Sequence, residues 1–124
     1  MGRVYYNKLV RDKIEEKIHS KGESCEVRSI ENIAEFEQEL LKKITEEATA
    51  LSRVRSRSEF LNEYADLMVV LDTLTRELEF SEADIKTAIS ENIKEKGGFS
   101  KKHFLIWSED ANYMSNETPQ GIKK

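Results

Sequence analysis

Residues that form turns and crosslinks are scarce in this 124-residue chain, which has one proline, five glycines and one cysteine. Sandwiches and barrels of β-strands need turn residues every ~8–12 positions, so the shortage argues against them and favours helices. The lone cysteine, Cys25, excludes an internal disulfide and cannot build a thiolate metal site by itself. We therefore expect one helical domain with a modest core.

Long apolar stretches and a surplus of positive charge are also missing. No stretch approaches the ~20 apolar residues of a membrane span, and no charged-then-apolar leader suggests secretion. The sequence therefore predicts a soluble, cytoplasmic protein without a membrane partner. Its net charge of −4 disfavours binding to a nucleic-acid polymer, which needs a concentrated basic face. A small basic patch could still bind a mononucleotide.

Apolar residues recur every three or four positions in several segments, as in helices with one buried face. The four predicted helices run from about Lys8 to Lys21, from Ile33 to Val54, from Ser56 to about Leu78, and from Ser81 to the glycine pair at Gly97. Two starts carry capping-box patterns, Ser56 with Glu59 and Ser81 with Asp84. Glycine after a helix is a common stop signal.

Short connections between these helices favour antiparallel neighbours in a four-helix-bundle-like fold. The stretch Leu67–Leu71 is apolar all round, which predicts burial on every side. One partner helix gives too little cover for it, so a bundle completed by a second subunit is favoured over a coiled-coil hairpin. The apolar run Phe104–Trp107 fits a small strand or a packing segment. Residues 108–124 lack periodicity, which predicts a mobile tail beyond a domain of residues 1–107.

Several carboxylates fall where apolar residues are expected. Glu47 continues the buried spacing of Leu40 and Ile44 on its helix, while Glu63 and Asp66 are three apart and share a face of the next helix. Buried carboxylates are normally paired, protonated or bound to a metal. An oxygen-only pocket suits Mg²⁺ or Mn²⁺. The alternative is an ordinary solvated face, since the chain has 24 acidic residues.

The same residues carry a family resemblance that spans about Tyr5 to Trp107. The matching runs are YNKLVRDKI at 6–14, KITEE at 43–47, EYADL at 63–67 and GGF at 97–99. Together they resemble the phosphoribosyl-ATP pyrophosphohydrolase-like branch of the all-α MazG superfamily.

This resemblance implies a MazG-type helical domain that assembles as a homodimer or homotetramer. It also implies Mg²⁺-dependent hydrolysis of a nucleoside triphosphate between its α and β phosphates, which yields a monophosphate and pyrophosphate. Such enzymes act in house-cleaning of noncanonical or surplus nucleotides, or on a nucleotide of the histidine pathway. Their metal motif is EExxE followed by ExxD.

Matched residue by residue, Glu46 and Glu47 align with the paired glutamates, and Glu63 and Asp66 align with ExxD. The resemblance implies that Glu47, Glu63 and Asp66 hold the metal and that Glu46 orients or deprotonates the attacking water. Ala50 departs from the pattern, because it stands where the third glutamate is expected. The alternative is therefore a catalytically weakened relative that binds a nucleotide or a protein partner without turnover.

Phosphates also require cations, and the candidates are Lys8 and Arg11, which lie in the matching N-terminal run, and Lys96 near the glycine pair. Any one of them could equally be ordinary surface charge. His19 and His103 have no metal-ligand spacing with each other or with Cys25, which predicts surface or packing roles for both.

Overall fold

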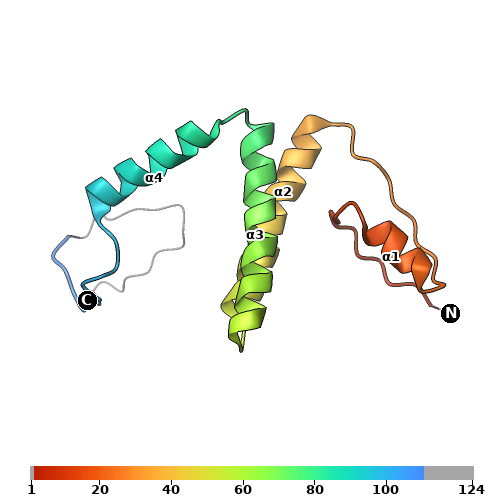
Figure 1. The fold of residues 1–124 in the computed structure, drawn as a ribbon, viewed down its shortest axis with the longest axis horizontal. Helices are drawn as coiled ribbons and strands as arrows, with labels where there is room; N and C mark the ends of the chain where they lie inside the picture. Colours follow the sequence, from red (N-terminus) through yellow and green to blue (C-terminus); the bar gives the residue numbers. More distant parts are fainter. Residues whose placement is uncertain (1, 111–124) are drawn as a thin grey trace. The chain divides into compact units, whose positions relative to one another are not determined.

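The computed structural model describes residues 2–110, and within that range it contains four α-helices and no strand. They are α1 (Ile14–Ser20), α2 (Ile33–Ser52), α3 (Arg57–Glu77) and α4 (Glu82–Lys96), as Figure 1 shows. The predicted all-α class is confirmed, and Phe104–Trp107 forms no strand. None of these helices is long and apolar enough to cross a membrane. The predicted tail lies mostly outside the described residues.

The chain divides into two units, residues 1–85 and 86–124, and the candidate site lies in the first. Its centre is a hairpin in which α2 and α3 pack side by side (Figure 1). Leu40 of α2 and Val70 and Leu74 of α3 are buried in its core. The partly buried residues around them are Leu9, Phe36 and Ile44.

Both predicted capping boxes are present at helix starts. The Ser56 hydroxyl accepts the Glu59 backbone N–H at 3.1 Å, and the Glu59 carboxylate accepts the Arg55 N–H at 2.6 Å. At the start of α4, the Ser81 hydroxyl accepts the Asp84 N–H while the Asp84 carboxylate accepts the Ser81 N–H. Each box satisfies the N–H of the third helical residue and one N–H at or just before the cap, so these starts are encoded locally.

The first helix is shorter than predicted, because it begins at Ile14 rather than near Lys8. Asn7 has a φ of +46°, which a right-handed helix does not allow. The side chain of Lys8 donates to Glu46 on α2, and Leu9 packs against the core. Tertiary contacts therefore hold this segment against the hairpin in a non-helical path. Helix α2 also ends at Ser52, two residues before the predicted Val54.

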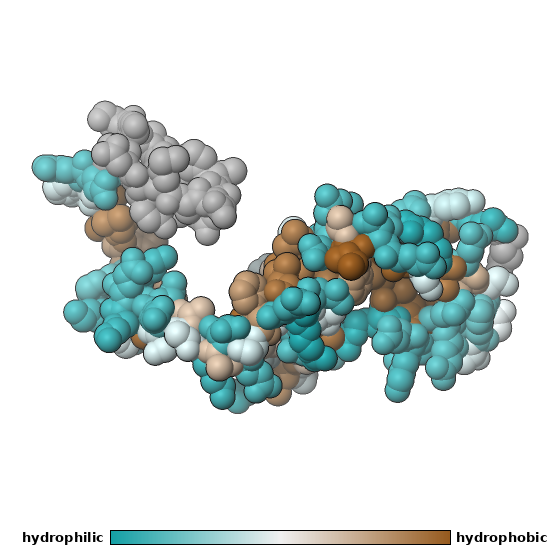
Figure 2. Space-filling model, turned by 90° about the horizontal axis from the view of Figure 1, so that it is seen from above, coloured by the Kyte–Doolittle hydropathy of each residue, from teal (hydrophilic) through white to brown (hydrophobic). Residues whose placement is uncertain are grey.

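Within the single chain, Leu67–Leu71 is not buried on every side, and its burial in an oligomer stays a prediction. Val70 is 6% exposed, but Met68 is 43% and Val69 39% exposed. The reason is that α2 covers one side of α3 and leaves another side open. Further exposed apolar side chains on the hairpin are those of Leu41, Phe60, Leu61 and Tyr64. Figure 2 shows hydrophobic surface between the charged side chains of the molecule.

Candidate metal centre

Three carboxylates meet where α2 and α3 pack against each other. One oxygen each from Glu47 on α2 and from Glu63 and Asp66 on α3 lie within 4.8 Å of one another, and all three residues are half-buried. The three-residue spacing on α3 puts Glu63 and Asp66 on one face, and the hairpin brings that face to Glu47. The structure thus groups the three residues that the sequence singled out as metal ligands.

The side chain of Glu47 is 16% exposed, against 37% for that of Asp66. Burial raises the pKa of Glu47, and the negative charges of Asp66, Glu46 and Glu63 raise it further, while Lys43 opposes them. Like charges this close favour protonation of one group or capture of a cation. A cation bound at Glu47 would therefore offset the repulsion between its carboxylate and the neighbouring acids.

Lys43 belongs to this site, although the sequence analysis assigned it no role. Its side chain is 12% exposed, and its ammonium lies 2.9 Å from Glu46 and 3.8 Å from Glu47. Lys43 precedes these acids by three and four residues, a spacing that places all three on one side of a helix. This spacing is visible in the sequence and could have predicted that Lys43 lies beside the two acids. Lys43 partly neutralises the acids from within their own helix.

Glu46 lies next to the three-carboxylate cluster and binds two ammonium groups. Its Oε1 accepts from Lys8 and its Oε2 from Lys43, both at 2.9 Å. The hydrogen bond from Lys8, followed by that from Lys43, lowers the pKa of Glu46. Reciprocally, the hydrogen bond to Glu46 raises the pKa of Lys8. Both carboxylate oxygens are engaged, so Glu46 here fixes Lys8 beside the acidic cluster.

A cleft of about 450 Å³ adjoins the cluster on the side of the N-terminal segment. Its walls carry Arg11, Lys13 and Lys17, and Asp66 lines it as well. The Arg11 guanidinium lies 3.5 Å from the Asp66 carboxylate. Lys13 and Lys17 are four residues apart and share one face of the α1 region. This spacing could have added Lys17 to the candidate phosphate-binding residues. Asp12 lines the cleft too, so three cations and two acids surround a space that begins at a candidate metal ligand.

Three other residues are not part of the cluster. Asp72, a further acid on α3, is paired with Arg76 one turn along the helix. Ala50 lies one turn after Glu47 on α2 and provides no oxygen from its side chain. Lys96, the last residue of α4, belongs to the second unit. A phosphate-binding role for Lys96 stays a prediction.

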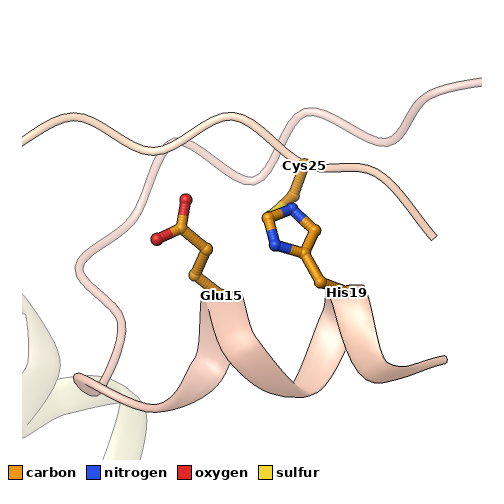
Figure 3. A group of neighbouring side chains, drawn as sticks. All are labelled: Glu15, His19 and Cys25. Carbon is orange, nitrogen blue, oxygen red and sulfur yellow. The ribbon is translucent and has the colours of Figure 1, made fainter. Parts of the chain in front are cut away.

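A second group of potential ligands forms where none was expected. The carboxylate of Glu15, the imidazole of His19 and the thiol of Cys25 lie within 4.8 Å of one another (Figure 3). The sequence analysis assigned His19 a surface or packing role, and His19 is exposed. The six-residue separation of His19 and Cys25 did not indicate that the chain turns back between them and brings their side chains together.

Comparisons with known proteins add no further information about this site. The chain matches no protein-family model, and no curated protein or solved structure matches it significantly.

Proposed function

We propose that this protein is a Mg²⁺-dependent nucleoside triphosphate pyrophosphohydrolase of the MazG type. The observation that carries the proposal is the grouping of Glu47, Glu63 and Asp66 on two packed helices. These are the residues that the family resemblance aligns with metal ligands. The cationic cleft beside Asp66 adds a place for the phosphates. The reaction would cleave between the α and β phosphates and release pyrophosphate.

The donor set fits a hard divalent cation. Three carboxylates supply only oxygen, which Mg²⁺ and Mn²⁺ prefer. The pKa of Glu47 is raised first by burial and then by the neighbouring negative charges, and a bound cation would compensate those charges. Glu47, Glu63 and Asp66 would hold the ion. When bound, such an ion neutralises charge on phosphate oxygens and orients a phosphoryl group for in-line attack by water.

The positive side chains of the first unit would bind and orient the polyphosphate. Arg11, Lys13 and Lys17 line a cleft whose volume of about 450 Å³ is that of a typical small-molecule site. Arginine can bind phosphate oxygens in a bidentate manner, and lysine contributes a compact charge.

Two further lysines, Lys8 and Lys43, lie beside the acidic cluster, and both are bound to Glu46. Phosphate oxygens would compete with Glu46 for both ammonium groups. Its carboxylate would then be free to orient or deprotonate the attacking water. This exchange preserves the role that the sequence motif implies for Glu46, although the residue is fully engaged by the two lysines when no phosphate is bound.

The same proposal includes a homo-oligomer that completes the helical bundle. Leu61, Tyr64 and Met68 are exposed at 67%, 46% and 43%, and their spacing puts them along one side of α3. A stripe of this kind on a helical hairpin is an incomplete core. A second copy would cover it, and sedimentation of Met68→Lys against the unmodified chain would test this directly. Dissociation into monomers is the expected result.

Pyrophosphate release from a panel of standard and modified nucleoside triphosphates tests the activity. Release should require Mg²⁺ or Mn²⁺ and be lost in Glu63→Gln and in Asp66→Asn. Asp72→Asn is the matched control, because Asp72 is an acid on the same helix that pairs with Arg76 outside the cluster. If Asp72→Asn impairs release as much as Asp66→Asn does, the cluster is not the catalytic centre.

A second candidate function rests on Ala50, which leaves the site one carboxylate short of the family motif. A weakened relative would bind a nucleotide or a protein partner without turnover, because fewer charged ligands hold a divalent cation less tightly. Nucleotides would then raise its melting temperature while no pyrophosphate appears. Ala50→Glu distinguishes the two functions. If this substitution activates an otherwise silent protein, the native chain is the binding relative.

A further inference from the structure

Glu15, His19 and Cys25 lie together because α1 and the turn after it place them so. Glu15 and His19 are four residues apart on α1 and rise from the same side of the helix (Figure 3). Gly22, with a φ of +75°, then reverses the chain, and its N–H donates to the His19 carbonyl at 3.0 Å. The returning segment carries Cys25 back over the helix toward the two side chains.

The distances among these side chains are those of a metal-ligand set. Zn–S and Zn–N bonds of ~2.3 and ~2.05 Å at a tetrahedral angle place the two donor atoms ~3.6 Å apart. The Cys25 sulfur lies 3.7 Å from Nε2 of His19. A Glu15 oxygen is within 4.8 Å of both, on an exposed side chain at the surface of the helix.

The chemistry of the donors indicates which ion. A thiolate and an imidazole are softer ligands than the carboxylates of the acidic cluster, and one thiolate, one imidazole and one carboxylate suit Zn²⁺ rather than Mg²⁺. We propose that Glu15, His19 and Cys25 form a Zn²⁺ site with three protein ligands and a water molecule as the fourth. Binding replaces the thiol proton, which passes to solvent. This site goes beyond the proposed function and does not depend on it.

The position of this site indicates what the ion would do for the fold. Helix α1 has only seven residues, too few to be stable alone in water. A metal bridge from Glu15 and His19 to Cys25 would tie the helix to the segment that follows it. Lys13 and Lys17, two residues before these ligands, point to the opposite side, where they line the cationic cleft. Zn²⁺ would therefore rigidify the helix whose other face forms that cleft.

Metal titration of the full chain tests the site with Zn²⁺ by calorimetry and with Co²⁺ as a spectroscopic probe. The chain has a single cysteine, so any thiolate-to-Co²⁺ charge-transfer band reports Cys25 alone. The titration is performed in Glu63→Gln/Asp66→Asn, which removes binding at the acidic cluster. In that variant we expect one ion per chain, displacement of Co²⁺ by Zn²⁺, and no response to Mg²⁺. The same thiolate band should appear in the native chain.

Matched substitutions separate the triad from adventitious binding. Cys25→Ser should abolish the thiolate band, while His19→Gln should weaken Zn²⁺ binding by at least the ~10–100-fold that loss of a second-shell partner costs. Glu15→Gln should weaken it as well. Glu16→Gln and His103→Gln remove a neighbouring acid and the other histidine, and both should bind Zn²⁺ as the native chain does.

Three results would each overturn the proposal. The first is Co²⁺ binding without a thiolate band, and the second is an equal loss of affinity in His103→Gln and His19→Gln. The third is one ion per two chains with metal-induced dimers in sedimentation, which would mean that exposed groups bridge separate molecules. Absence of pyrophosphohydrolase activity would leave all these readouts unaffected, so the two proposals fail independently.

Discussion

Replacing Glu47 by glutamine should stabilise the metal-free protein and remove its response to Mg²⁺. At an effective dielectric constant of ~20, two carboxylates at the outer limit of 4.8 Å would repel by about 3.5 kcal/mol, and Glu47 has two neighbours within that limit. Its attraction to Lys43 at 3.8 Å offsets about 4.4 kcal/mol. Solvent around the partly exposed Asp66 screens the remaining repulsion to about 1 kcal/mol.

The assay is thermal unfolding of Glu47→Gln and the native chain in a chelator and in Mg²⁺, at one protein concentration. In chelator near neutral pH the variant should melt about 4 °C higher, as ~1 kcal/mol implies for a domain of this size. Mg²⁺ should raise the melting temperature of the native chain only, because binding to the folded state alone stabilises it.

The pH dependence gives this prediction a second test. The pKa of Glu47 is raised in the folded state, so the folded state holds this proton more tightly than the unfolded chain does. The electrostatic cost is therefore absent below the ordinary glutamate pKa of ~4.3 and grows as pH rises through the raised value. The advantage of Glu47→Gln should vanish near pH ~4 and be complete near neutrality.

Glu39→Gln is the matched control for this experiment. Its side chain is 21% exposed, close to the 16% of Glu47, but it pairs with Lys42 on the same helix outside the cluster. Glu39→Gln should be neutral or slightly destabilising and should keep the Mg²⁺ response. If Glu47→Gln is instead less stable than the native chain in chelator, attraction to Lys43 dominates and the reasoning about carboxylate crowding is refuted.

Three further substitutions test other parts of the first unit. Lys8→Met removes the hydrogen bond that most lowers the pKa of Glu46. The ion pair stabilises the fold above pH ~4.3 and is lost on acidification, so stability near neutral pH should fall by about 0.2–0.5 kcal/mol. An unchanged pH profile of unfolding would contradict the pairing. Ser56→Ala should cost about 1 kcal/mol in denaturant unfolding, because it removes the cap of α3; a cost near zero would show that the cap is dispensable. Leu40→Ala should cost ~2–5 kcal/mol, since it leaves a cavity in the core, and a smaller cost would indicate that the hairpin closes around the gap.

Local features of the fold were predictable, and non-local ones were not. The starts of α3 and α4 could be predicted because the residues of each capping box are neighbours in the sequence and hydrogen-bond to one another. The start of α1 was not, because Lys8 is held by Glu46, a residue 38 positions away. Helical periodicity continues through residues 8–13, but long-range contacts override it.

The candidate site divides in the same way. The heptad-like slot of Glu47 and the shared face of Glu63 and Asp66 follow from helix geometry, so the sequence by itself determined which acids face the interior. Only the tertiary structure decided that the two helices pack with these faces in register, that Lys8 and Lys43 engage Glu46, and that Cys25 returns to His19. Helical spacing is a property of consecutive residues, whereas the pairing of faces and the reversal at a turn depend on contacts between segments that no local pattern records.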